Sequence, residues 1–222
     1  MKKEKEEDLH KAFQERSPHI IGEMRWRVHS VLLPFVWERG EVHILFQRRA
    51  KSLRQQPGEV SFPGGRVEPG ETSQQAARRE CQEELLLPEE DISIYGPGEI
   101  LATPSGRRID SFIGALPHYQ GTFSRAEVDS VFTVPLAFFR QTVPTTYVNH
   151  LRLDMAEDFP YGKIPGGRNY RWELGDYPMV FYQYRGDIIW GLTARLMQAN
   201  MKLIDQYDLE GWFRRTGDFR DR

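Results

Sequence analysis

A short stretch of the chain carries three glutamates at a spacing that gathers their carboxylates on one side of a helix. Glu80 and Glu84 are four residues apart, and Glu83 lies between them. Residues three and four apart share one side of an α-helix, so like charges at this spacing repel and destabilise the isolated helix. A bound divalent cation would remove that penalty, and carboxylate oxygens are ligands that suit Mg²⁺ or Mn²⁺. The spacing therefore indicates a metal site.

The segment before these glutamates has the features of a turn followed by a helix N-terminus. The run Phe62-Pro63-Gly64-Gly65 ends a short β-like stretch and bends the backbone where glycine is favoured. Thr72 and Gln75 have the spacing of a capping box, and Pro88 stops a helix expected over about residues 73–86. A Glu-Glu pair alone is more often a solvated helix face. Turn, cap and acids in one unit favour the metal site.

The same helix should have an apolar side and an orienting cation. Its inward stripe consists of Ala77, Cys81 and Leu85. Arg79 can reach Glu83 one turn further on, or fold back to Glu71. Either contact would orient the carboxylates.

Residues 65–87 resemble the Nudix box. The residues that carry the match are Gly65, Glu71, Arg79, Glu80, Glu83, Glu84 and Leu87. Cys81 stands at an aliphatic position, which is a mild departure because a buried free cysteine behaves as a small hydrophobe. Leu86 stands where the family has glycine, at a helix exit that glycine eases into a left-handed turn. We expect a changed exit geometry there, with no metal ligand lost.

The resemblance implies roles for these residues. The implied metal ligands are the Gly65 carbonyl, Glu80, Glu83 and Glu84, and the implied catalytic residues are Glu71, Arg79, Glu83 and Glu127. Glu83 would be a ligand or the general base, and Glu71 with Arg79 would be an orienting pair. Family members often place a further carboxylate before a later strand, and Glu127 is the best candidate, with Asp129 behind it. Both acids are equally compatible with an ordinary loop.

The segment upstream of the box resembles the extra signature of coenzyme A pyrophosphatases, a Nudix subfamily. The residues on that signature are Arg49, Ala50, Arg54, Gly58 and Phe62. The resemblance implies that Arg49, Arg54, Gly58 and Phe62 bind substrate. With Arg48 and Lys51 they make a basic loop that suits a polyanion such as coenzyme A, although any one arginine there is as readily a solvated residue. Arg107 and Arg108 could also touch substrate, but cations at a loop tip are more often solvated.

Composition limits the class of protein. The 222 residues carry a formal net charge of −2, so no global basic field indicates a nucleic-acid partner. A single cysteine excludes an intrachain disulfide, and no apolar run is long enough to cross a bilayer. The charged N-terminus has no apolar stretch behind it and is not expected to be a signal peptide. We expect a cytoplasmic protein with a nucleotide substrate, no nucleic acid and no membrane, and we leave a homodimer open.

Hydrophobic patterning predicts an α/β fold. Strands are expected over residues 27–37, 42–47, 92–103, 109–116, 147–154, 170–173 and 179–184, with another after Glu127, and helices over 136–140 and about 189–203. A mixed β-sheet flanked by helices is an α/β/α sandwich, which is also the fold that the Nudix resemblance implies. We divide the chain into an N-terminal helical extension (1–25), a Nudix hydrolase domain (26–206) and a polar C-terminal tail (207–222). The Gly- and Pro-rich loop over 159–167 is either a lid or an insertion.

The residues themselves predict metal-assisted hydrolysis of a phosphate ester or anhydride, with one glutamate taking a proton from water. The resemblance implies that coenzyme A is the substrate, cleaved to adenosine 3′,5′-bisphosphate and 4′-phosphopantetheine. Two alternatives remain. One is a Nudix hydrolase of another nucleoside diphosphate derivative such as ADP-ribose, and the other is a catalytically inactive Nudix domain that senses a nucleotide.

Overall fold

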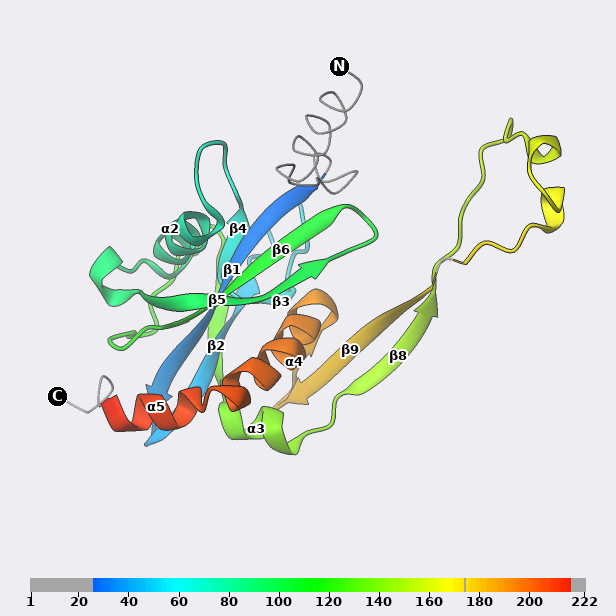
Figure 1. The fold of residues 1–222 in the computed structure, drawn as a ribbon. Helices are drawn as coiled ribbons and strands as arrows, with labels where there is room; N and C mark the ends of the chain where they lie inside the picture. The colour runs from blue at the N-terminus through cyan, green and yellow to red at the C-terminus, as the bar shows by residue number, and fades with distance from the viewer. Residues whose placement is uncertain (1–25, 174, 217–222) are drawn as a thin grey trace, which may run out of the picture.

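The computed structural model describes residues 26–173 and 175–216 (Figure 1). The N-terminal helix expected within residues 1–25 lies outside the described residues. None of the described helices is both long and apolar enough to cross a membrane.

A seven-stranded mixed sheet forms the centre of the molecule. Its strands are β1 (Arg27–Glu38), β2 (Glu41–Arg49), β3 (Val60–Ser61), β4 (Gly64–Arg66), β5 (Ser93–Ala102), β6 (Arg107–Ala115) and β7 (Val128–Pro135). The order β3-β2-β1-β6-β5 is extended by β4, which pairs with β1, and by β7, which pairs with β2. The pair β1 and β6 is parallel, while the other pairs in the sheet are antiparallel. The sheet is therefore mixed, as the sequence predicted.

Helices cover both faces of this sheet (Figure 1). The helices are α2 (Ser73–Leu85), α3 (Leu136–Gln141), α4 (Gly191–Gln206) and α5 (Leu209–Thr216), with short 3₁₀ turns η2 (Glu89–Asp91), η3 (Tyr161–Lys163) and η4 (Gly167–Asn169). On one face, Cys81 of α2 packs in a cluster with Leu32 of β1. On the other, Met197 of α4 packs in a cluster with Leu33. Neighbouring residues of one strand point to opposite faces, so β1 serves both cores and the α/β/α sandwich is confirmed.

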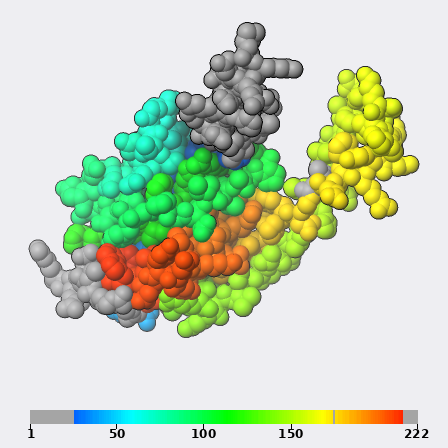
Figure 2. Space-filling model, viewed as in Figure 1, coloured from blue at the N-terminus to red at the C-terminus, as the bar shows by residue number. Residues whose placement is uncertain are grey.

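A separate three-stranded sheet projects from this body. It consists of β8 (Thr145–His150), β9 (Asp176–Tyr184) and β10 (Asp187–Trp190), all antiparallel. The hairpin of β8 and β9 reaches away from the rest of the molecule and ends in an aromatic cluster that includes Phe159 and Trp172 (Figures 1 and 2). The strand expected over residues 170–173 is wrong, because this stretch has no strand pairing. Its aromatic side chains pack on one another at the tip of the hairpin and not within a sheet.

The C-terminal part differs from the prediction at both of its ends. Ile189, expected to begin the terminal helix, lies in β10, and α4 begins at Gly191. Residues 209–216, assigned to a polar tail, form α5, and Phe213 of α5 is 1% exposed. Its ring centroid lies 4.7 Å from that of Phe35 in β1. Leu209 also packs against the core and Trp212 lies on Tyr95, so apolar contacts dock this largely polar segment.

Candidate active site

Helix α2 is fixed in position at its start and along one side. The Thr72 hydroxyl accepts a hydrogen bond from the Gln75 backbone N–H (3.2 Å), and the Thr72 N–H donates to Gln75 Oε1 (2.8 Å). This is the predicted capping box. The predicted stripe, Ala77, Cys81 and Leu85, is fully buried. The buried stripe sets the rotation of the helix and leaves its acidic side free to meet other elements.

The helix ends in a left-handed residue. Leu86 has φ 56° and ψ 46°, and its side chain is 58% exposed. The expected change in exit geometry is therefore wrong, because leucine adopts the conformation that glycine usually takes there. For a residue with a Cβ this conformation costs about 1–2 kcal/mol. The chain keeps the family's turn at an energetic cost.

Three carboxylates from two segments meet beside β4. One oxygen from each of Glu80, Glu84 and Glu127 lies within 4.8 Å of the others. Glu84 is 2% exposed and accepts a hydrogen bond from the Gly64 N–H at 2.8 Å. Three converging carboxylates, one of them deeply buried, make a set of hard oxygen donors that fits a divalent cation. Glu127, which sequence left equally compatible with an ordinary loop, is brought to the cluster by the start of β7.

Burial dominates the electrostatics of the cluster. Burial raises the pKa of Glu84 to about 7, and the Gly64 N–H opposes that rise. Burial also raises the pKa of Glu80, opposed by its hydrogen bond from Arg79. Without a cation, folding therefore disfavours the ionised form of both acids.

Arg79 connects the acids of α2 to one another. Its guanidinium donates to Glu71 twice, from Nη2 to Oε1 (2.8 Å) and from Nε to Oε2 (3.2 Å). Nη1 donates to Glu80 Oε1 (2.9 Å) and to Glu83 Oε2 (3.2 Å), and Nη2 also reaches the Arg66 carbonyl (3.1 Å). The side-chain bond from Arg79, and then the hydrogen bond from the Glu68 N–H, lower the pKa of Glu71. The structure thus joins Glu71 and Arg79 as the sequence suggested.

Glu83 stands apart from the three converging carboxylates. Its side chain is 54% exposed, and its Oε2 accepts a hydrogen bond from Arg79 Nη1 at 3.2 Å. The role of Glu83 as a metal ligand stays a prediction, and an exposed carboxylate held by one oxygen is better placed as a base.

Two glycines allow α2 and β1 to approach the turn closely. A Cβ on Gly65 would lie 2.3 Å from the Glu80 carboxylate. A Cβ on Gly64, whose φ is +152°, would lie 2.3 Å from the Ser30 carbonyl oxygen. Any side chain at Gly65 would therefore push Glu80 out of the cluster.

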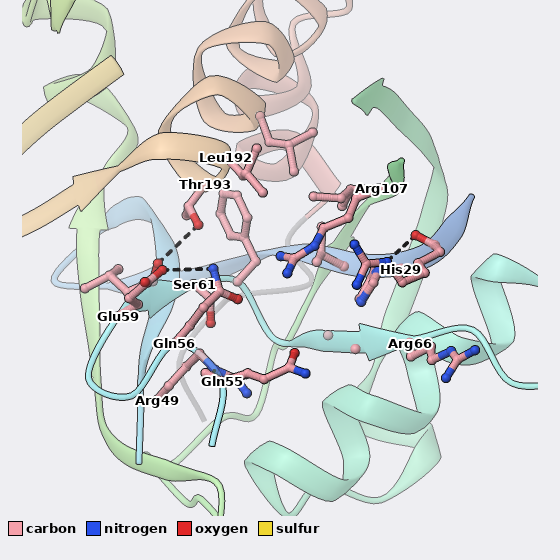
Figure 3. Close-up of a pocket in the computed structure, with 18 residues that line it drawn as sticks. His29, Arg49, Gln55, Gln56, Glu59, Ser61, Arg66, Arg107, Leu192 and Thr193 are labelled. Carbon is pink, nitrogen blue, oxygen red and sulfur yellow. Dashed lines mark hydrogen bonds between the residues drawn. The ribbon is translucent and has the colours of Figure 1, made fainter. Parts of the chain in front are cut away.

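A cavity of about 460 Å³ opens next to this cluster (Figure 3). Of the residues predicted to bind substrate, Arg49 and Phe62 line it, while Arg54 and Gly58 do not. Arg54 is exposed on the loop before β3. Gly58, with φ +74°, holds that loop together: its carbonyl accepts from Arg48 Nη1 and its N–H donates to the Arg49 carbonyl, both at 3.0 Å. Arg49 Nη1 lies 3.9 Å from Glu84 Oε1, so Arg49, at the end of β2, lines the cavity and also lies next to the acid cluster.

The cavity is also lined by residues that the sequence did not single out. These are chiefly Arg27, His29, Arg66, Gln55 and Gln56. Arg107 lines it as well, whereas the neighbouring Arg108 is paired with Asp110 at 2.7 Å. Arg27 was visible only as the first residue of a predicted strand. Its place beside Arg107 depends on the parallel pairing of β1 and β6, which no local pattern reveals.

Comparisons with known proteins agree with this geometry. A family model described as the NUDIX domain matches residues 26–140. An uncharacterized Nudix hydrolase named NudL from Citrobacter koseri is 35% identical over 197 residues, covering 86% of this chain and 91% of that protein. The protein of the same name from Photorhabdus laumondii is 29% identical over 170 residues, covering 76% of this chain and 80% of that protein.

Among solved structures, the chain is similar to a Nudix hydrolase from M. smegmatis, RenU, with a TM-score of 0.44 and 24% identity over 51% of this chain and 73% of that one. On the family match and the Citrobacter relative, the chain belongs to the Nudix hydrolase family, whose members are divalent-metal-dependent pyrophosphohydrolases of nucleoside diphosphate derivatives.

Proposed function

We propose that this Nudix hydrolase cleaves the diphosphate of coenzyme A, or of a coenzyme A derivative, to adenosine 3′,5′-bisphosphate and 4′-phosphopantetheine. The observation that carries the proposal is the position of Arg49. It belongs to the signature that resembles coenzyme A pyrophosphatases, it lines the cavity, and its guanidinium lies 3.9 Å from Glu84. A cation at that point faces both the acid cluster and the space where a polyanionic substrate would lie.

The acid cluster is the part of the site that would hold Mg²⁺ or Mn²⁺. Glu80, Glu84 and Glu127 would supply carboxylate oxygens, and the Gly65 carbonyl is a further candidate ligand. When bound, the metal neutralises phosphate charge and lowers the pKa of a water molecule.

The remaining residues would orient the metal-binding carboxylates and accept a proton from the attacking water. Arg79 holds Glu80 through Nη1 and is itself held by two bonds to Glu71, so this pair fixes the carboxylate that faces Gly65. Glu83 keeps Oε2 on Arg79, which leaves Oε1 as the atom that would take a proton from the attacking water. Arg49 would balance the charge of the diphosphate at the cavity wall.

Product analysis with purified protein tests the proposal. Coenzyme A, ADP-ribose and NADH are each incubated with Mg²⁺ or Mn²⁺, and products are separated by chromatography. We expect adenosine 3′,5′-bisphosphate from coenzyme A, dependent on metal and abolished or strongly reduced in Glu83→Gln. Glu90→Gln, which changes an exposed acid outside the site, is the matched control.

The other outcomes separate the alternatives. Turnover of ADP-ribose alone would keep the enzyme and reject coenzyme A as its substrate. No turnover with any of the three substrates would reject both and favour an inactive Nudix domain that senses a nucleotide.

A further inference from the structure

Three arginines and a histidine meet where three strands lie side by side. Arg27 of β1 is the register partner of Arg107 on the parallel strand β6. Two residues along β1, His29 is the register partner of Arg66 on the antiparallel strand β4. Arg27 and Arg107 carry like charges on neighbouring strands, and such charges repel each other. The fold therefore accepts an unfavourable pairing at this end of the sheet.

Nothing acidic in the described part of the chain compensates these charges. No carboxylate there lies within 4.0 Å of a guanidinium nitrogen of Arg27, Arg66 or Arg107. Among the described residues, the side chains of the three make one hydrogen bond, from Arg27 Nη2 to the Ser105 carbonyl at 3.3 Å. By contrast, Arg108 is paired with Asp110 and Arg79 with Glu71. Within the described part of the chain, the three arginines are therefore cations without a carboxylate partner.

All three arginines line the cavity of the active site, at one end of it. In Figure 3, Arg66, His29 and Arg107 lie on one side of the cavity, and Glu59, Ser61 and Thr193 lie on the other. Arg66 directly follows Gly65, the residue that packs against Glu80. Burial, and then the charges of Arg107, Arg27 and Arg66, lower the pKa of His29, against the hydrogen bond to the Arg27 carbonyl that raises it.

We propose that Arg27, Arg66 and Arg107 form a subsite for a phosphomonoester that the substrate carries in addition to its diphosphate. The inference rests on the proposed function, because it places the diphosphate at the acid cluster and asks what a second anionic group would meet. Guanidinium groups match phosphate oxygens geometrically, and three of them balance a dianion. A substrate without this phosphate leaves the arginines unpaired, which is how a polar site rejects an incomplete analogue.

The proposal predicts that the protein prefers a substrate with the extra phosphate, and that replacing one of these arginines weakens this preference. The substrates to compare are coenzyme A and 3′-dephospho-coenzyme A, which differ only in a phosphomonoester. We expect kcat/KM of the unchanged protein to be about tenfold or more higher for coenzyme A. Arg107→Gln should lower kcat/KM for coenzyme A by about 10–100-fold and leave the value for the dephospho compound within about threefold. Arg66→Gln should act in the same direction, and Lys202→Gln, which removes an exposed charge on α4, should change neither.

Equal losses on both substrates in Arg107→Gln and Arg66→Gln would assign these arginines a structural role and overturn the subsite. So would an unchanged protein that turns over both substrates equally well.

A binding measurement keeps the subsite separate from the activity. Adenosine 3′,5′-bisphosphate and adenosine 5′-monophosphate are titrated calorimetrically into the metal-free protein. We expect tighter binding of the bisphosphate, with the difference lost in Arg107→Gln. That result without coenzyme A turnover would reject the proposed function and keep the subsite. Turnover of coenzyme A with equal binding of the two nucleotides would keep the proposed function and reject the subsite.

Discussion

The acidic side and the basic side of the candidate site are built in different ways. The acidic side, beside the cavity, comes mainly from one segment, the β4 turn and helix α2, with Glu127 as its one distant member. The basic side, in the cavity lining, is assembled from the starts of β1 and β6 and the ends of β2 and β4. The acidic side follows from residue spacing in and next to one helix. The basic side forms only when strands distant in sequence pair in the right register. The sequence therefore predicts the acidic side but little of the basic side.

The largest effect should come from the most buried acid. Glu84→Gln keeps the size of the side chain but removes a charge from the cluster, and we expect kcat to fall about 1,000-fold, which corresponds to about 4 kcal/mol. The measurement is steady-state turnover of coenzyme A at saturating Mg²⁺, with Glu90→Gln as the control. A variant that kept a tenth of the activity would show that Glu84 is not a ligand.

The raised pKa of Glu84 predicts how the metal-free protein responds to pH. Its folded pKa is about 7 against an ordinary value of 4.5, so the folded state holds a proton that the unfolded state has lost between these values. Stability is then fully present below about pH 4.5 and falls by on the order of 1–3 kcal/mol as pH rises through 7. Urea unfolding in EDTA at several pH values measures this slope.

Glu84→Gln should flatten this dependence and stabilise the metal-free protein at pH 8, opposite to its effect on turnover. Added Mg²⁺ should stabilise the unchanged protein most at high pH, where the carboxylate is ionised. An identical pH dependence in the variant would mean that other groups control it.

The orienting pair should matter less than a ligand. Arg79→Lys keeps the charge but loses the two-pronged bond to Glu71 and the bond to Glu80, and we expect kcat to fall about 10–100-fold. Glu71→Gln should lower kcat by a similar factor. The double variant should lose much less than the product of the two factors, because both changes break one connected unit. Multiplicative losses in that cycle would argue against a shared role.

On the basic side, the structure separates two arginines that the sequence treats alike. Arg49 lines the cavity near Glu84, whereas Arg54 is exposed outside the lining. We expect Arg49→Ala to lower kcat/KM for coenzyme A about tenfold or more and Arg54→Ala to lower it less than about threefold. The substrate-binding role of Arg54 stays a prediction. A larger loss in Arg54→Ala would mean that this loop folds over bound substrate.

Local chemistry explains which parts of the fold could be predicted. The cap at Thr72, the buried stripe through Cys81 and the mixed sheet follow from spacing and periodicity, and each is present. The strand expected at 170–173 failed because aromatic residues that favour strands also pack on one another at a loop tip. The docking of α5 was missed because a few apolar side chains, with Phe213 the most deeply buried, outweigh a polar composition.

In the candidate site too, local spacing predicts some contacts and tertiary packing determines the others. Glu71, Arg79, Glu80 and Glu84 could be placed together from helix α2 and the turn just before it. The contact of Glu127 with them requires the path of the chain into β7, and the pairing of Arg27 with Arg107 requires the register of two parallel strands. These are tertiary facts, because the energy that fixes them comes from burying both faces of the sheet and not from any local preference.

The smallest expected effect tests the one departure of the acidic side from its family pattern. Leu86→Gly would relieve a left-handed conformation at a residue that buries little surface, at the cost of a more flexible unfolded chain. We expect the variant to be about 0.5–1 kcal/mol more stable in urea, with kcat within about twofold of the unchanged protein. Leu87→Gly is the matched control, because Leu87 packs against the core and its removal should destabilise. A gain in kcat together with the gain in stability would mean that the strained exit restrains the acids of α2, and the two sides of the candidate site would then differ in rigidity as well as in origin.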